Sequence, residues 1–142
     1  MARPDPALLN AARYPFVTHI GTRYADLDPN EHVNNVALAA MMEDARVRFI
    51  DATGVRAEMA GVRYMVASHA TDFIAQAHYP DGIDCHCATA VVGRTSLTIL
   101  QMLTQSSVAV ALARTVMMCT DGARPVPLSD KARALLAPWI LT

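Results

Sequence analysis

The sequence has few cysteines, few charged residues and no apolar run of membrane-spanning length. Its three cysteines are an odd number and do not resemble a disulfide framework. The 12 Lys+Arg and 13 Asp+Glu give a net charge of −1, so there is no basic excess to neutralise nucleic-acid phosphates. The apolar run at Val108–Ala113 is stopped by Arg114, far short of the roughly 18–20 residues of a membrane span. We therefore expect neither a disulfide-rich protein, nor a nucleic-acid-binding protein, nor a protein with a membrane-spanning helix.

What remains is an apolar-rich chain of ordinary domain size. Apolar residues make up 53% of the 142 residues and charged ones only 18%, which excludes intrinsic disorder. We expect one domain over residues 1–142, with its core in about 16–136. The first six residues are followed only by Ala7-Leu8-Leu9, which is no signal-peptide core. The sequence therefore predicts a cytoplasmic protein.

The tripeptide Cys85-His86-Cys87 invites comparison with a metal site. On a strand, however, the two cysteines point to one face and His86 to the other, so the three cannot hold one ion. No second Cys/His pair at metal-binding spacing completes a site. We predict no bound metal and no cofactor.

The first half of the chain predicts a strand followed by a long helix. Residues Phe16–Tyr24 alternate in side-chain character, as a strand does. A polar loop follows, and the Ala-, Met- and Leu-rich segment Val36–Thr53 predicts a helix. Asn34 or Asn35 is suited to cap its start, and Gly54 to end it.

The second half predicts an antiparallel meander. Turn signals divide it into four strand-length pieces, at roughly Arg63–Tyr79, Ile83–Val92, Thr95–Thr104 and Val108–Thr120. A short helix over Ser129–Leu136 closes the chain. The predicted class is α+β: a five-stranded antiparallel sheet wrapped around one long central helix, plus a short C-terminal helix.

The predicted central helix is apolar almost all round. One broad stripe joins Leu38 to Phe49, while Val47 and Ile50 lie on nearly the opposite side. A helix of this kind is enclosed by other structure, and an edge strand beside it suggests a second subunit. Glu43 projects between Val47 and Ile50. We expect its carboxylate to be buried against a partner subunit, to line a pocket, or to reach Arg46 or a neighbouring surface.

The loop and the helix carry motifs that resemble a known family. The segment Tyr24–Pro29 is similar to aromatic-x-Asp-x-Asp-Pro, and Asp28–Asn35 to Asp-x-Asn-x-His-Val-Asn-Asn. Further matches are Glu43-Asp44-Ala45-Arg46, Val92-Gly93-Arg94-Thr95-Ser96 and Pro125-Val126-Pro127. Together they resemble the hotdog-fold thioesterases, in particular the 4-hydroxybenzoyl-CoA thioesterase-like group and the related acyl-ACP thioesterases.

The resemblance implies that the protein hydrolyses an acyl thioester, of CoA or of an acyl carrier protein. Asp28 matches the family's catalytic aspartate, which acts as nucleophile or as general base for water. His32 and Asn30 match its hydrogen-bonded partners, and Glu43 fits a second carboxylate. The backbone N–H of Asn35 matches the oxyanion donor at the helix N-terminus. Expected substrate contacts are Asn34, Asn35, Arg94 and Ser96.

The sequence also departs from the family. Where the family's helix commonly carries aromatics, this one has only Leu, Ala and Met over Leu38–Met42, which favours an aliphatic or bulky acyl group. The acyl-ACP branch usually has two fused domains, so we expect a homodimer, or a tetramer of dimers, with the site at the subunit interface. Two alternatives stay open: an enoyl-CoA hydratase of the same fold, and a non-catalytic acyl-CoA-binding module.

Overall fold

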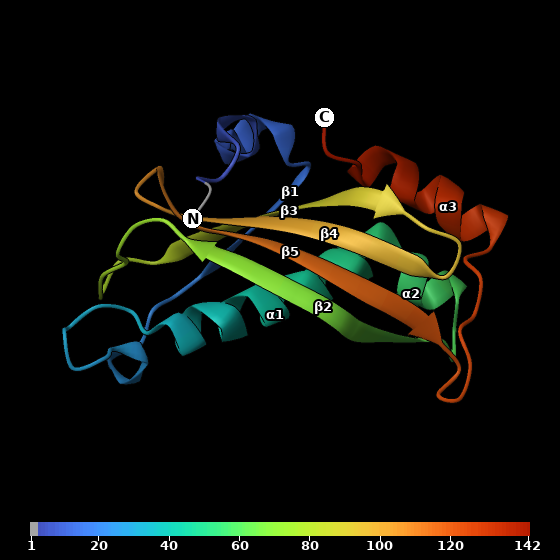
Figure 1. Cartoon of the computed structure of the whole chain (residues 1–142), viewed down its shortest axis with the longest axis horizontal. Coiled ribbons are helices and arrows are strands. Elements are labelled where there is room, and N and C mark those ends of the chain that lie inside the picture. The colour runs from blue at the N-terminus through green and yellow to red at the C-terminus, as the bar shows by residue number, and fades with distance from the viewer. Residues whose placement is uncertain (1–2) are drawn as a thin grey trace.

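A single antiparallel sheet forms the body of the molecule in our computed structural model, which describes residues 3–142. Its strands are β1 (Phe16–Ile20), β2 (Arg63–Phe73), β3 (Ile83–Val92), β4 (Ser96–Gln105) and β5 (Val108–Thr120). They lie in the order β1-β3-β4-β5-β2, so that β1 and β2 are the two edges. The predicted five-stranded antiparallel sheet is confirmed (Figure 1).

One long helix, α1 (Asn35–Thr53), runs along one face of this sheet (Figure 1). Of the two capping candidates, Asn34 is the cap: its Oδ1 accepts the backbone N–H of Val36 at 2.8 Å. The helix ends at Gly54, whose φ of 81° is a left-handed conformation that glycine adopts without a Cβ clash. Met42, Ala45 and Phe49 are buried against the sheet, which accounts for the broad apolar stripe.

Two predicted strands are shorter in the structure. The first ends at Ile20 rather than Tyr24, because the carboxylate of Asp26 accepts the N–H of Arg23 at 2.8 Å and bends Tyr24–Asp26 into a 3-10 turn. The second ends at Phe73 rather than Tyr79, because the N–H groups of Ile74 and Ala75 both donate to the carbonyl of Val110 in β5, which ends the regular ladder. Beyond that point the carbonyl of Ala77 accepts the N–H of Val33 at 2.8 Å, in the loop before α1.

The remaining elements are two short helices and two N-terminal 3-10 turns. Helix α2 (Val55–Glu58), which the sequence did not predict, follows Gly54 directly. Helix α3 (Asp130–Leu136) confirms the predicted C-terminal helix, capped by Ser129. Two 3-10 turns, Pro6–Leu9 and Ala11–Arg13, lie on the sheet face opposite α1, where Tyr14 joins a second apolar cluster.

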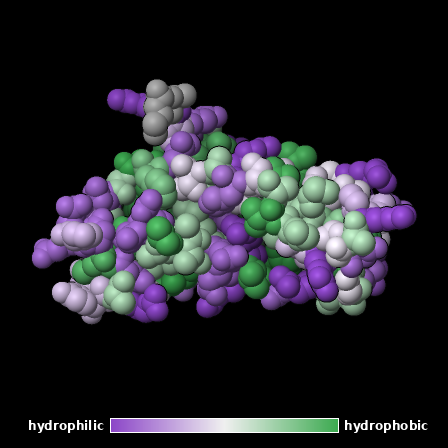
Figure 2. Space-filling view, turned by 60° about the horizontal axis from the view of Figure 1, so that its bottom comes forward, coloured by the Kyte–Doolittle hydropathy of each residue, from purple (hydrophilic) through white to green (hydrophobic). Residues whose placement is uncertain are grey.

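Strand β2 is unusual because little of the described chain covers it. It pairs only with β5, and most of its residues are exposed on both faces. Apolar side chains gather on this side of the molecule and are interrupted by polar ones (Figure 2). An exposed edge strand of 11 residues is a surface that other chains can pair with. No helix among residues 3–142 is both long and apolar enough to cross a membrane.

Candidate active site

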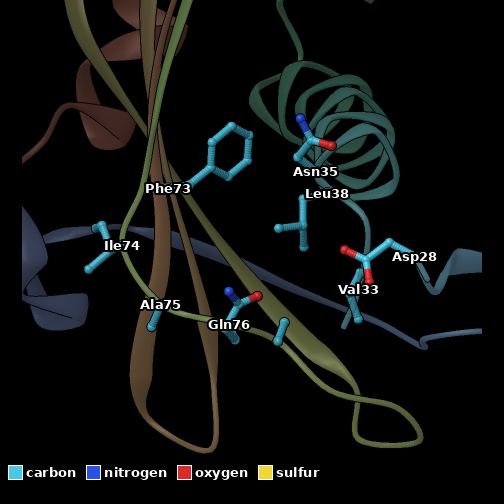
Figure 3. A pocket seen from close by; sticks show the side chains of 9 residues that line it. Asp28, Val33, Asn35, Leu38, Phe73, Ile74, Ala75 and Gln76 are labelled. Carbon is cyan, nitrogen blue, oxygen red and sulfur yellow. The ribbon is translucent and has the colours of Figure 1, made fainter. Parts of the chain in front are cut away.

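A cavity of about 430 Å³ opens where the loop before α1 faces the end of β2. One wall is the loop and the first turn of α1, with Asp28, Val33, Asn35 and Leu38. The opposite wall is the segment Phe73–Ala77, which leaves the sheet at the end of β2 (Figure 3). The carboxylate of Asp28 thus shares one hollow with the N-terminus of the central helix.

The loop holds Asp28 by one of its two carboxylate oxygens. Oδ1 accepts the backbone N–H groups of Asn30, at 2.8 Å, and of His32, at 3.1 Å. The backbone N–H of Asp28 donates to the carbonyl of His32 at 2.9 Å, which closes the loop, and Glu31 between them has a φ of 63°. Strained conformations of this kind cluster at functional sites. The other oxygen, Oδ2, has no hydrogen-bond partner among residues 3–142.

The start of α1 supplies an unpaired donor beside this carboxylate. Asn34 uses its side chain to cap Val36, and its own N–H donates to the carbonyl of Asp26 at 2.8 Å. The N–H of Asn35 donates to no acceptor within the described part of the chain and lies at the positive end of the helix dipole. An oxygen that gains negative charge during a reaction is stabilised in such a place.

A buried aspartate, Asp26, holds the loop that carries Asp28 against the start of α1. Asp26 is only 5% exposed, and its carboxylate accepts a 2.7 Å hydrogen bond from Nη2 of Arg23. That hydrogen bond holds the pKa of Asp26 below its ordinary value. Its backbone carbonyl receives Asn34, so Asp26 joins the loop to the helix start. These contacts give Asp26 a structural role in the loop.

The predicted site residues of the loop come together, but their side chains do not form one network. The ring of His32 does not hydrogen bond to Asp28; it lies edge-on to the ring of His78, with centroids 5.2 Å apart. The side chain of Asn30 is exposed, and only its backbone N–H contacts Asp28. The backbone of the loop, rather than its side chains, therefore orients the carboxylate.

Two residues beside the cavity were missed by sequence reasoning. His78 falls inside the predicted strand Arg63–Tyr79, but in the structure it lies beyond β2 and its ring faces that of His32. Gln105, buried at the end of β4, clamps the same segment: it accepts the N–H of His78 and donates to the carbonyls of His78 and Asp81, at 2.8, 2.8 and 2.9 Å. No local pattern signals either residue, because both act on a segment that is distant in the sequence.

Three other predicted site residues lie elsewhere in the chain. Arg94 and Ser96 lie at the β3–β4 turn, which contacts α3: Nη2 of Arg133 donates to the carbonyl of Gly93 at 2.7 Å. This turn is at the C-terminal end of α1, a helix about 28 Å long at 1.5 Å per residue (Figure 1). Glu43 is exposed near the middle of α1 and lines a different cavity. Within one subunit, none of the three lines the hollow that contains Asp28.

The buried thiols give no sign of a metal centre. Cys85 and Cys87 lie on the same face of β3, as predicted, with their sulfurs 3.9 Å apart. The neighbouring thiol and desolvation keep the pKa of Cys85 well above its ordinary value, so it stays protonated. Among residues 3–142, no group of three His, Cys, Asp or Glu side chains is placed to hold a metal ion.

Comparison with known proteins agrees with this geometry. One antiparallel sheet wrapped around a long central helix is the hotdog fold. The model of the thioesterase-like superfamily matches residues 22–136, and the chain belongs to that family. No curated protein matches the sequence.

Three solved structures have the same fold. The PA5185 protein from Pseudomonas aeruginosa strain PAO1 is 25% identical, with a TM-score of 0.82, over 93% of this chain and 96% of that one. A thioesterase from Thermus thermophilus, complexed with coenzyme A and Zn, is 27% identical, with a TM-score of 0.78, over 87% and 92%. The gentisyl-coenzyme A thioesterase BH1999 is 15% identical, with a TM-score of 0.77, over 86% and 100%. The last likeness concerns the fold alone.

Proposed function

We propose that this thioester hydrolase acts on acyl-CoA and that Asp28 is its catalytic group. The observation that supports the proposal most strongly is the free Oδ2 of Asp28, which shares a cavity with the unpaired N–H of Asn35. Hydrolysis needs a group that attacks or activates water and a donor for the developing oxyanion. The cavity offers one of each.

Two routes are consistent with this geometry. As a general base, Asp28 takes a proton from water while the oxygen of that water attacks the thioester carbonyl. As a nucleophile, Asp28 attacks the carbonyl itself and expels the thiolate, and water then hydrolyses the mixed anhydride. In both routes the carbonyl oxygen becomes an oxyanion near Asn35, and the products are a carboxylic acid and a thiol.

The cavity and one relative indicate the substrate class. The Thermus thermophilus thioesterase binds coenzyme A, which favours a CoA thioester over an acyl carrier protein. Leu38 and Phe73 give the cavity two apolar walls, and no charged side chain other than Asp28 lines it. This lining suits an uncharged, aliphatic or bulky acyl group. The reaction as written requires no cofactor.

We further infer a homodimer, or a tetramer built from dimers, with the site at the subunit boundary. Val47, Val66 and Phe73 expose 44%, 46% and 48% of their surface along α1 and β2. Such a surface, next to an unpaired strand edge, suits a second copy of the chain (Figure 2). A second copy also offers a role for Arg94 and Ser96, which lie far from Asp28 within one subunit: they are candidates to bind the nucleotide of CoA at the neighbouring site.

Thiol release from a panel of acyl-CoAs, followed with DTNB, tests the proposal. We expect turnover by the wild-type chain and a decrease in kcat/KM of about 10²–10⁴-fold in Asp28→Asn. Asparagine keeps an oxygen for the amides of Asn30 and His32, so the loop remains folded. Hydration of an enoyl-CoA without thiol release would favour the hydratase. Binding without turnover across the panel would favour the binding module.

A further inference from the structure

Two histidine rings pack against each other beside the loop that carries Asp28. The ring of His32 meets that of His78 edge-on, with centroids 5.2 Å apart and an angle of 72° between the ring planes. Neither histidine lines the cavity of Asp28, and neither ring hydrogen bonds to another residue within 3–142. The ring pair therefore joins two segments of the chain and does not border the space for the substrate.

The backbone of His32 is bound to Asp28 twice. The N–H of His32 donates to Oδ1 of Asp28 at 3.1 Å, and its carbonyl accepts the N–H of Asp28 at 2.9 Å. His32 thus orients the carboxylate through its main chain, while its side chain anchors His32 itself. A small displacement of a reacting group can slow a reaction strongly, so the anchor of this backbone amide matters for the carboxylate.

The sheet holds the other ring of the pair in place. Gln105, which is 8% exposed at the end of β4, accepts the N–H of His78 and donates to its carbonyl, both at 2.8 Å. One position earlier, the carbonyl of the buried Ala77 accepts the N–H of Val33 at 2.8 Å. Two adjacent links, one between backbones and one between rings, therefore connect this segment to the loop. A continuous series of contacts runs from β4 to the carboxylate of Asp28.

We propose that His78 is a positioning residue for hydrolysis: its ring holds His32, and His32 sets the direction of the Asp28 carboxylate. The inference rests on the proposed role of Asp28. The contact is one of shape, because the edge of one ring packs on the face of another without a transferred proton. A hydrocarbon ring in place of His78 should therefore serve equally well. All of these contacts lie within one chain, so a second copy that covers β2 and α1 leaves them intact.

Hydrogen exchange at the His32 amide tests the positioning without turnover. We expect exchange at least about three-fold faster in His78→Ala, since loss of a ring contact favours local opening. His78→Phe should keep the wild-type rate. Tyr24→Ala is the matched control, because it removes the other ring contact between the same two segments, that of Tyr24 with Tyr79, whose centroids are 6.0 Å apart. This control should leave exchange at His32 unchanged.

The kinetic test separates kcat from KM for an acyl-CoA. His78→Ala should lower kcat at least about ten-fold and change KM by less than about two-fold, because the ring orients the carboxylate and does not contact substrate. His78→Phe should restore kcat, and Tyr24→Ala should match the wild type. His32→Ala should lower kcat by a similar factor. The double variant of His32 and His78 should be no slower than His32→Ala, because both changes break one contact.

Four results would overturn the inference. They are wild-type exchange at His32 in His78→Ala, equal loss of kcat in His78→Ala and His78→Phe, a raised KM at unchanged kcat, and additive losses in the double variant. Equal loss with alanine and phenylalanine would make the imidazole an acid or a base, and a raised KM would place it against the substrate. A wild-type chain that hydrolyses no acyl-CoA contradicts the proposed function, whereas the exchange rates still decide whether His78 holds the loop.

Discussion

Two aspartates two positions apart show how differently one residue type is used in this loop. Asp26 is buried and accepts hydrogen bonds from Arg23, whereas Asp28 keeps one oxygen free beside the cavity. An acceptor-only group that is fully engaged holds structure, and one that is half-engaged remains available for chemistry. Burial and partners, rather than residue type, separate the two roles.

Asp26 should make folding stability depend on pH. Its hydrogen bond with Arg23 lowers its pKa in the folded state, while the unfolded chain has an ordinary value of about 3.9. The native state therefore binds fewer protons than the unfolded one. The stabilisation is present above the unfolded pKa and is lost as the pH falls through the folded pKa.

We expect Asp26→Asn to flatten the acid side of the stability profile, measured by urea unfolding between pH 6 and pH 3. Asp81→Asn, which alters an exposed aspartate whose carboxylate makes no hydrogen bond within residues 3–142, should keep the wild-type slope. Equal slopes for the wild type and Asp26→Asn would show that Asp26 does not contribute in this way.

The residues that sequence could predict are those whose role is set by their neighbours in the chain. Asp28 and Asn35 could be predicted as site residues because a loop and the helix it enters are contiguous, and both line one cavity. His78 and Gln105 were not predicted, because their contacts join segments 24 positions or more apart. Side-chain packing across the fold, which a single sequence does not encode locally, decides such pairs.

At the scale of elements, the capped start of α1 connects stability with the site. Replacing Asn34 by Ala removes the acceptor for Val36 and should lower the free energy of unfolding by about 1 kcal/mol. Asn34→Asp keeps an acceptor and should restore most of the loss. Asn30→Ala is the matched control for stability, because that side chain is exposed and unbonded within the described chain; it should change the free energy by less than about 0.5 kcal/mol. Denaturant titration of the three variants measures these differences.

The chain that follows the Phe73–Ala77 wall of the cavity is held by one buried side chain of β4, Gln105. Gln105→Met would leave the N–H and carbonyl of His78 and the carbonyl of Asp81 without that partner. We expect a loss of about 2–3 kcal/mol in unfolding free energy, at about 1 kcal/mol per hydrogen bond. Hydrogen exchange at the His78 amide should accelerate.

Gln76→Met is the control for the Gln105→Met variant. Its glutamine is exposed and makes no side-chain hydrogen bond with any described residue, so both readouts should stay near those of the wild type. If Gln105→Met left the exchange of His78 unchanged, another contact would hold this wall. The interaction of His32 with His78 would then be the next to test.

Two strand ends were predicted wrongly, because hydrogen bonds outside the strand decide where each strand stops. The alternation of Phe16–Tyr24 continues beyond the point where β1 ends, because the capping of Arg23 by Asp26 overrides strand propensity. The strand predicted as far as Tyr79 stops at Phe73, where the chain turns from β5 toward the loop before α1. Periodicity identifies an element, while its ends depend on competing hydrogen bonds.

At the scale of the whole molecule, a single chain leaves an unusually large share of one strand uncovered. Strand β2 has a neighbour on one side only, and its exposed residues include Met65 and Val66. The other edge strand, β1, has only five residues, so it offers less backbone for pairing. The face formed by β2 and α1 is therefore the one on which we expect self-association.

Sedimentation analysis tests this expectation directly. The wild type should have about twice the single-chain mass of 15.3 kDa, or four times that mass if dimers pair. Val66→Lys places a charge on the apolar surface of β2 and should shift the protein to monomers, because desolvating an unpaired ammonium is costly. Val91→Lys alters a similarly exposed valine on β3 and should retain the wild-type mass.

If Arg94 and Ser96 serve the neighbouring site, the monomeric variant should also lose at least about ten-fold in kcat/KM for acyl-CoA, since its CoA contacts are gone. A wild-type chain that sediments at 15.3 kDa while hydrolysing acyl-CoA would show that one subunit suffices.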